Sequence, residues 1–164
     1  MSLTLKKLKS VLSYDPLTGV FRWKIKPRQR ACSEIAGGVN PDGYRMICVS
    51  QRIYRAHRLA WFYMTGRWPK GEVDHINGTK DDNRIANLRI ADKQENQANS
   101  KRRSTNTTGF KGICVLQGRD KKYCARITVN YKVIWLGNFY TAEEAHAAYF
   151  AAAKKYFGEF ARAA

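Results

Sequence analysis

Residues 73–99 read VDHINGTKDDNRIANLRIADKQENQAN, and this stretch decides the fold of the N-terminal part of the chain. Asp74 and His75 lie between two apolar residues, which predicts a short strand running into an Asn-Gly turn. The run NLRI from Asn87 predicts a second strand, and Asp92 is placed to cap a following helix. The stretch therefore predicts a ββα unit.

Chemically, the same stretch concentrates acids and amides in a chain that is strongly basic. The chain has 30 Lys and Arg against 13 Asp and Glu, a net charge of +17. Six of those 13 acids fall between Glu72 and Glu95. Such an excess of positive charge predicts a polyanionic partner, with nucleic acid ahead of a membrane surface. Basic ribosomal and packaging proteins share this signature, so charge alone names no function.

Length and composition set further bounds. A chain of 164 residues forms one compact domain or two small ones, and 44% hydrophobic residues argue against a disordered chain. The four cysteines form no C-x-x-C pair, which argues against a zinc knuckle or ribbon. Lysines interrupt the N-terminal apolar pattern, so no secretory signal is expected, and no apolar run approaches the ~20 residues of a membrane span. We expect a cytoplasmic protein with reduced thiols, located in the host cell if a phage encodes it.

Four elements are expected before the ββα unit, each from its hydrophobic periodicity and from the turn or capping residues at its ends. They are an amphipathic helix on Leu5, Leu8, Val11 and Leu12 that ends near Asp15-Pro16, a strand over 18–26, a hairpin over 43–57 that turns near Ser50-Gln51, and a buried helix over 57–66 closed by Gly66.

The C-terminal part has a different pattern. The polar, basic residues 100–108 predict a linker, and three strands are expected within 109–117, 121–130 and 132–140. A helix over 141–158 follows, with alanines and tyrosines along one stripe that would cover the apolar face of the sheet. The opposite face, which carries Arg126, should be exposed. The predicted fold class is thus α+β, with a ββα module before a three-stranded antiparallel sheet packed on one helix.

The acidic stretch contains the groups that phosphodiester hydrolysis requires. A neutral imidazole such as that of His75 can take a proton from water near neutral pH. A hard divalent cation stabilises charge on the phosphate and the leaving oxygen, and it takes oxygen ligands. Asp74 can supply a carboxylate oxygen, and Asn96 on the following helix can supply a neutral one.

In order and spacing, this pattern resembles the HNH (ββα-metal) nucleases, specifically the phage and intron homing-endonuclease branch. The resemblance covers roughly residues 14–100 and rests on Val73 to Gly78, Asp82-Asn83, Asn87 to Arg89, Glu95-Asn96 and the upstream segment YRAHRLAW. It implies that His75 is the general base, that Asp74 and Asn96 are metal ligands, and that Asn87 pins the loop and orients the histidine. The implied cofactor is Mg²⁺ or Mn²⁺. The third letter of HNH denotes a histidine, and this chain has an asparagine there, which lowers the expected affinity for zinc.

Neighbouring residues carry weaker predictions. Arg84 and Arg89 are candidates for phosphate contact, although solvated charges are an equal alternative. We interpret His57, in YRAHRLAW, as a satisfied structural histidine. The basic linker, which includes Lys101, Arg102 and Arg103, is expected to lie along DNA.

The C-terminal sequence, residues 106–162, resembles the APETALA2-type (ethylene-response-factor) DNA-binding domain, most specifically in WLGNFYTAEEAHAAY. The resemblance implies that one sheet face meets DNA and that three basic residues lie near phosphate. The face comprises Cys114, Arg126, Thr128 and Trp135, and the basic residues are Arg119, Lys121 and Lys122. The alternative for Trp135 is a core aromatic. Cysteines stand where the plant pattern has arginines, so this sheet is expected to add affinity more than sequence choice.

Together these features predict two domains that act on double-stranded DNA. An HNH module over 1–99, with its ββα core at about 72–99, is joined by a linker at 100–108 to an APETALA2-type domain over 109–164. A metal-dependent endonuclease with a single site should nick one strand as a monomer, whereas a homodimer could cut both. The main alternative is a catalytically silent DNA-binding regulator that retains the HNH fold, and an RNA-binding protein is a third.

Overall fold

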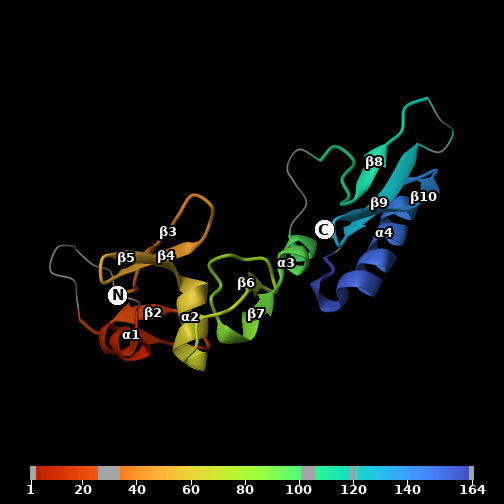
Figure 1. The fold of residues 1–164 in the computed structure, drawn as a ribbon. Coiled ribbons are helices and arrows are strands. Elements are labelled where there is room, and N and C mark those ends of the chain that lie inside the picture. The colour runs from red at the N-terminus through yellow and green to blue at the C-terminus, as the bar shows by residue number, and fades with distance from the viewer. Residues whose placement is uncertain (1–2, 26–33, 101–105, 119, 121, 163–164) are drawn as a thin grey trace. The chain divides into compact units, whose positions relative to one another are not determined.

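The computed structural model has an α+β fold and describes residues 3–25, 34–100, 106–118, 120 and 122–162 (Figure 1). The chain divides into two compact units, Met1–Ala91 and Asp92–Ala164, called unit 1 and unit 2 below. Five residues predicted to meet DNA lie outside the described residues, namely Lys101, Arg102, Arg103, Arg119 and Lys121.

Unit 1 consists of small antiparallel sheets and two α-helices. Its elements are α1 (Leu5–Val11), β1 (Leu12–Tyr14), β2 (Phe21–Trp23), β3 (Gly38–Val39), β4 (Arg45–Val49), β5 (Arg52–Arg55), α2 (Ala56–Thr65), β6 (Glu72–His75), the 3₁₀ turn η1 (Ile85–Asn87) and β7 (Leu88–Ala91). β1 pairs with β2, β3 to β5 form a three-stranded sheet, and β6 pairs with β7. The core gathers apolar residues from all of these layers, including Leu8, Leu12, Phe21, Ile47 and Leu59, which are all fully buried.

Two predictions for unit 1 are confirmed and one is wrong. The hairpin β4–β5 turns at Ser50 and Gln51, which adopt φ values of 50° and 64°. Helix α2 ends at Gly66 in the left-handed conformation. The first helix, however, ends at Val11 instead of continuing through Leu12 towards Asp15. Leu12 takes an extended backbone because it pairs with Trp23 of β2 and buries its side chain completely.

The β6–β7 hairpin carries the residues of greatest chemical interest. Its register places Asp74 opposite Arg89 and His75 opposite Leu88. Asn87 lies in η1, so the second strand starts one residue later than the sequence suggested. The two strands thus bracket a loop of nine residues, 76–84, and η1.

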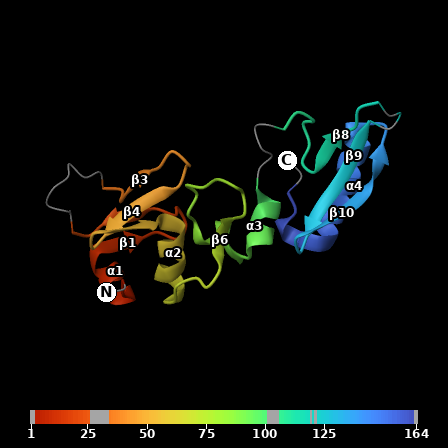
Figure 2. The same cartoon turned by 45° about the horizontal axis from the view of Figure 1, so that its top comes forward.

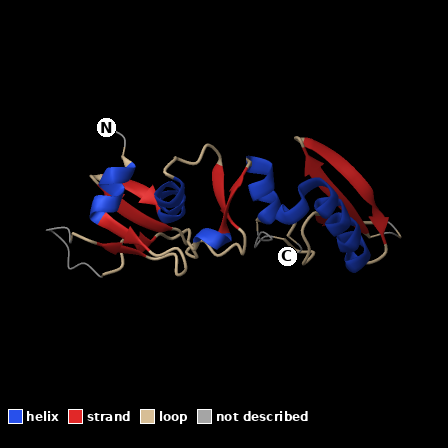
Figure 3. Ribbon diagram, turned by 90° about the horizontal axis from the view of Figure 1, so that it is seen from below, coloured by secondary structure: helices blue, strands red, loops and turns tan. Residues whose placement is uncertain are grey.

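Unit 2 is a three-stranded antiparallel sheet covered by a helix on one face. Its elements are α3 (Lys93–Asn99), β8 (Ile113–Val115), β9 (Tyr123–Val129), β10 (Lys132–Phe139), α4 (Ala142–Phe157) and the 3₁₀ turn η2 (Gly158–Phe160). The strand order is β10-β9-β8, and α4 runs along one side of the sheet (Figures 2 and 3). The core between them combines four alanines with three larger residues, namely Ala125, Ala145, Ala152, Ala153, Ile113, Ile127 and Tyr149.

The predicted sheet and helix of this part are confirmed. The β9–β10 turn falls at Asn130 and Tyr131, both with positive φ, and Thr141 caps α4 by accepting from the backbone N–H of Glu144. Arg126 lies on the exposed face as expected. Trp135 is 65% exposed, so the alternative that it is a core aromatic is wrong.

Candidate active site

Unit 1 contains an unusual set of buried polar side chains close together in sequence. His57, Asp74, His75, Asn83 and Asn87 are all less than 10% exposed. A buried polar group is costly unless it is hydrogen-bonded, so the partners of these residues matter. The five residues lie on β6, the following loop, η1 and the start of α2.

Asp74 is held by an ion pair across the β6–β7 hairpin. The Arg89 Nε donates to Asp74 Oδ2 at 3.0 Å, and the two side chains are 7% and 11% exposed. Burial makes such a pair stable only when both partners are present, because either charge alone would be uncompensated. The solvated alternative for Arg89 is therefore wrong.

The His75 ring is oriented by Asn83. The Asn83 Nδ2 donates to the backbone carbonyl of Asp81 at 3.0 Å, which turns the amide oxygen towards the histidine. His75 Nε2 lies 3.4 Å from that oxygen and must carry the proton to donate to it. Burial lowers the pKa of His75, against the opposing effects of Asn83 and Asp74. The imidazole is therefore neutral at neutral pH, with the lone pair on Nδ1.

Asn87 closes the loop that follows β6. Its Oδ1 accepts from the backbone N–H of Asn77 at 3.0 Å, while its Nδ2 donates to Asn77 Oδ1 at 3.1 Å and to the Asp82 carbonyl at 2.8 Å. Its own carbonyl accepts from the N–H of Ile76 at 2.9 Å. One asparagine thus ties both ends of the loop together next to His75.

Two residues near the N-terminus, Tyr14 and Gly19, contact the loop that follows β6. The Tyr14 hydroxyl donates to the Asn83 carbonyl at 2.7 Å, and burial raises the pKa of that tyrosine to about 12. Gly19 adopts φ +73°, and a Cβ there would lie 2.4 Å from the backbone nitrogen of Arg84. Only glycine allows so close an approach. The first twenty residues therefore help to place Asn83 against His75.

His57 packs directly against His75. Their ring centroids lie 4.9 Å apart with the planes nearly perpendicular, and Tyr44 lies 5.4 Å from His57 and 6.2 Å from His75. Burial, and next the charge of a protonated His75, lower the pKa of His57 to about 3. The sequence suggested a structural role for His57, but neither its contact with His75 nor the nearby Tyr44 was foreseen.

Arg84 is bound to an acid of the same loop. Its Nε and a terminal nitrogen lie 2.7 Å and 2.6 Å from the two carboxylate oxygens of Asp82. This contact, more than any other, holds the pKa of Asp82 down at about 2. As phosphate contacts, Arg84 and Arg89 stay predictions, and each already has a carboxylate partner.

The donor atoms near His75 fit a hard cation better than a soft one. Among the described residues, no group of three or more His, Cys, Asp and Glu side chains is arranged to hold a metal ion. A single carboxylate such as Asp74 nevertheless suits Mg²⁺, which takes most of its ligands from water and substrate phosphate. Asn96 lies on α3 in unit 2, so its pairing with Asp74 stays a prediction.

In unit 2, the residues predicted to meet DNA share the sheet face that α4 leaves open. Trp135 of β10 lies opposite Arg126 of β9, and Cys114 of β8 lies opposite Cys124. Thr128 and Lys122 are also exposed. The structure brings these side chains together, while contact with DNA stays a prediction.

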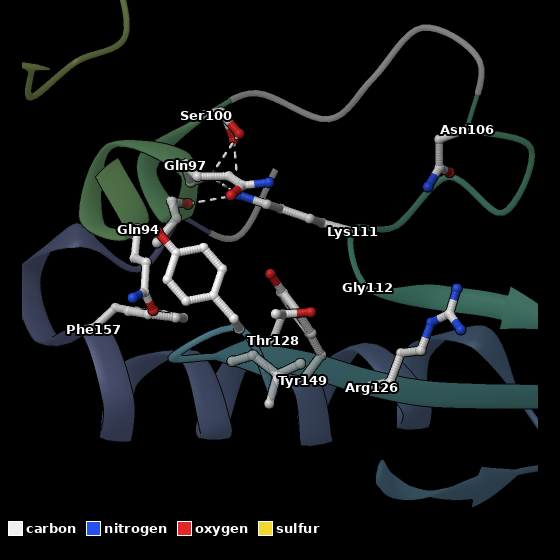
Figure 4. A pocket seen from close by; sticks show the side chains of 13 residues that line it. Gln94, Gln97, Ser100, Asn106, Lys111, Gly112, Arg126, Thr128, Tyr149 and Phe157 are labelled. Atoms are coloured by element: carbon white, nitrogen blue, oxygen red, sulfur yellow. Dashed lines mark hydrogen bonds between the residues drawn. The ribbon is translucent and has the colours of Figure 1, made fainter. Parts of the chain in front are cut away.

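A hollow of about 720 Å³ opens beside this sheet, between α3, β9 and α4 (Figure 4). Arg126 and Thr128 line it, and Lys111 reaches across to the end of α3. The Lys111 ammonium donates to the carbonyls of Gln97, Ala98 and Ser100 at 3.1, 2.6 and 3.0 Å. Burial lowers the pKa of this lysine to about 8. Lys111 thus fastens α3 to the rest of unit 2.

Part of the chain matches a known family of nucleases in sequence. Residues 54–98 match the HNH endonuclease family. The matched segment runs from β5 to α3 and so includes Asp74, His75, Asn87 and Asn96. The match supports a nuclease and, with it, a DNA substrate.

One curated relative, Protein 3.8 of Escherichia phage T7, is 40% identical over 60 residues. The aligned part is 36% of this chain, and the chain spans half the length of that protein. No solved structure matches the chain. Within the described part of the chain, no helix has both the length and the apolar character that crossing a bilayer requires.

Proposed function

We propose that the protein is a divalent-metal-dependent HNH endonuclease of the homing type that hydrolyses phosphodiester bonds in double-stranded DNA. The observation that carries the proposal is the buried pair Asp74 and His75 at the end of β6, within the segment that matches the HNH family. Each of the two is fixed by its own partner, Arg89 or Asn83. Such fixed side chains meet the demand of catalysis for pre-positioned groups.

In this proposal His75 is the general base. Its Nε2 proton is directed at Asn83, so Nδ1 is the atom that accepts the proton of the attacking water. Because burial lowers its pKa, His75 is in the basic form at neutral pH. Asn87 keeps the loop closed and so keeps Asn83 in place.

Asp74 and Asn96 would hold the metal, for which Mg²⁺ or Mn²⁺ is the expected ion. When bound, the ion supplies Lewis-acid stabilisation of charge on the phosphate and the leaving oxygen. Arg89 would orient the Asp74 carboxylate, which it contacts in the structure. The sheet of unit 2, with Arg126, Thr128 and Trp135 on its open face, would add affinity for duplex DNA.

One site cuts one strand at a time, so we propose that the monomer nicks DNA and that double-strand cleavage would require a homodimer. The net charge of +17 supports binding to nucleic acid, whether single or double stranded. The phage origin of the relative that aligns over 60 residues fits a mobile genetic setting.

A second candidate function is a catalytically silent DNA-binding regulator that retains the nuclease fold. The Asp74–Arg89 pair favours it, because the carboxylate proposed to hold the metal already has a buried cationic partner. A carboxylate satisfied in this way is stable without any metal ion.

The deciding experiment is nicking of a supercoiled plasmid that carries the protein's own binding site, with Mg²⁺ or Mn²⁺ present. We expect wild-type protein to relax the plasmid and His75→Ala to reduce the rate by at least about a hundredfold, because general-base catalysis contributes that much or more. Binding to the same duplex without metal should stay within about twofold for His75→Ala, since a neutral buried histidine contributes little to the electrostatic attraction.

His57→Gln is a control for general damage at the site, because this side chain is buried beside His75 without being assigned the proton transfer. Residual nicking by this variant alongside none by His75→Ala supports the assigned roles. Wild-type protein that binds the plasmid but never relaxes it establishes the regulator. Tighter binding to folded RNA than to duplex DNA would instead support an RNA-binding protein.

A further inference from the structure

Beside the buried site, two exposed cations share one aromatic ring. The Arg55 guanidinium carbon and the Lys80 Nζ each lie 4.8 Å from the centroid of the Tyr44 ring. Arg55 ends β5, Lys80 follows β6, and Tyr44 immediately precedes β4. Both ends of the β4–β5 hairpin and the loop after β6 therefore meet at this ring.

Hydrogen bonds fix the arrangement. The Asn40 Oδ1 accepts from the backbone N–H of Tyr44 at 2.8 Å, and Lys80 donates to the Asp42 carbonyl at 2.9 Å. Next to them, Arg45 makes two hydrogen bonds of 2.8 and 2.7 Å to the Asp81 carboxylate. These contacts tie the turn before β4 to the loop after β6 and so hold Lys80 over the ring, while the pairing of β5 with β4 places Arg55 beside it.

The charges of this pair are not neutralised within the part of unit 1 that the structure describes. Three other arginines of unit 1 have acidic partners there, since Arg45 pairs with Asp81, Arg84 with Asp82 and Arg89 with Asp74. Arg55 and Lys80 are exposed and form no ion pair with a described residue. Both positive charges lie within 5 Å of the centre of one ring, so both attract an anion that approaches it.

The pair also lies next to the proposed general base. The Tyr44 ring centroid is 6.2 Å from that of His75, so the two cations over this ring lie close to the buried site. Phosphates follow one another along a DNA strand at about 3.4 Å of helix rise. A strand that presents one phosphodiester to His75 therefore brings neighbouring phosphates close to Tyr44.

We infer that Arg55 and Lys80, seated on Tyr44, form a binding site for the backbone phosphates that flank the scissile phosphodiester. This inference rests on the proposed nuclease function for its place on the substrate. It gives Arg55 and Lys80 the role that the sequence suggested for Arg84 and Arg89. The cations contact phosphate and carry no sequence information, so they act on every duplex alike.

The first test measures duplex binding without metal over a range of salt concentrations. Arg55→Ala and Lys80→Ala should each weaken binding by roughly tenfold and lower the slope of log affinity against log salt by about 1, and the double variant by about 2. Arg52→Ala is the matched control, because Arg52 lies on the same strand and alternation directs it to the opposite face from Arg55. It should leave the slope nearly unchanged.

The second test locates the contact with a duplex in which single phosphates are replaced, one at a time, by uncharged methylphosphonates. Replacement at the contacted phosphates should weaken binding by wild-type protein and leave the Arg55→Ala/Lys80→Ala variant unaffected. Replacement elsewhere should weaken both proteins equally. Arg55→Lys and Lys80→Arg keep the charge and should recover most of the affinity, and unchanged melting temperatures would exclude unfolding as the cause.

The two proposals can fail separately. The phosphate site is wrong, even in an active nuclease, if Arg55→Ala and Lys80→Ala have the same salt slope as Arg52→Ala. It is also wrong if no methylphosphonate position weakens wild type while leaving the double variant unaffected. If such positions are found but the protein never nicks, the phosphate site stands and the nuclease function fails. If they lie far from a mapped nick, the placement beside the scissile bond is overturned.

Discussion

Unit 1 and unit 2 differ in where they keep their polar groups. Unit 1 buries His57, Asp74, His75, Asn83 and Asn87, which lie on β6, the loop after it, η1 and the start of α2. Unit 2 keeps Arg126 and Thr128 on an open sheet face, and its core is apolar, with alanines facing the sheet. A proton acceptor needs a fixed orientation, whereas an electrostatic contact with DNA needs only a side chain that reaches the phosphate.

This difference has a thermodynamic consequence. In unit 1 the buried Asp74 pairs with Arg89 and the buried His75 with Asn83, so removing one member leaves its partner without compensation. On an exposed face the partner of each charge is water, and removal changes stability little. Substitutions in unit 1 should therefore combine loss of stability with loss of activity, and those on the sheet face of unit 2 should separate binding from stability.

The largest expected effect is at the Asp74–Arg89 pair. Asp74→Ala leaves the Arg89 guanidinium buried without its carboxylate, and we expect it to lower the free energy of unfolding by about 3–5 kcal/mol. The measurement is chemical denaturation of the full chain. An unfolding free energy within 1 kcal/mol of wild type, at about the scale of an exposed pair, would contradict the buried role of this ion pair.

The double variant Asp74→Ala/Arg89→Met separates stability from chemistry. Removing both charges should recover most of the lost stability, because no buried charge is left. Nicking should stay absent, since the carboxylate proposed to hold the metal is gone. Recovery of nicking together with stability would show that Asp74 acts only as the partner of Arg89.

An intermediate effect is expected from pH, through His57. Its pKa is about 3 in the folded protein, below the ordinary value of 6.5, so the unfolded chain binds more protons between these two values. The free energy of unfolding should therefore fall as pH drops below 6.5, by up to about 1.4 kcal/mol per pH unit, and should not depend on this residue above 6.5.

The comparison that isolates this effect is wild type against His57→Gln between about pH 5 and pH 6.5, where most carboxylates are still ionised. The variant will be less stable at every pH, but its stability should change less steeply with pH across that window. Parallel curves for the two proteins would mean that His57 does not stay neutral on folding.

Several features of this molecule followed from local patterns in its sequence. The Ser50-Gln51 and Asn130-Tyr131 turns and the caps at Gly66 and Thr141 depend on a few neighbouring residues. The strand β9 shows its alternation directly, which was enough to place Arg126 on the exposed face. Periodicity failed at Leu12, where pairing with Trp23 across a turn overrides the helical spacing.

The site was predictable in its residue types but not in its contacts. The sequence pointed to Asp74 and His75 from their chemistry, yet the Asp74–Arg89 pair depends on the register of β6 and β7. The contact of Asn83 with His75 depends on a loop supported by Tyr14 and Gly19, nearly seventy residues away in the chain. Such long-range contacts leave no periodic signal, and they decide which arginine is available to DNA.

The smallest expected effect on stability is on the open face of unit 2. Arg126→Ala removes an exposed charge, so the free energy of unfolding should change by less than about 0.5 kcal/mol. Duplex affinity should fall severalfold, because one cation that faces DNA is lost, and nicking at saturating protein should be unchanged.

Lys132→Ala is the matched control. It removes one charge from the neighbouring strand β10, at a position whose alternation with Trp135 directs it away from the Arg126 face. Equal affinities for the two variants would show that this sheet attracts DNA only through its overall charge. Weaker duplex binding by Arg126→Ala than by Lys132→Ala would place DNA on the face that α4 leaves open.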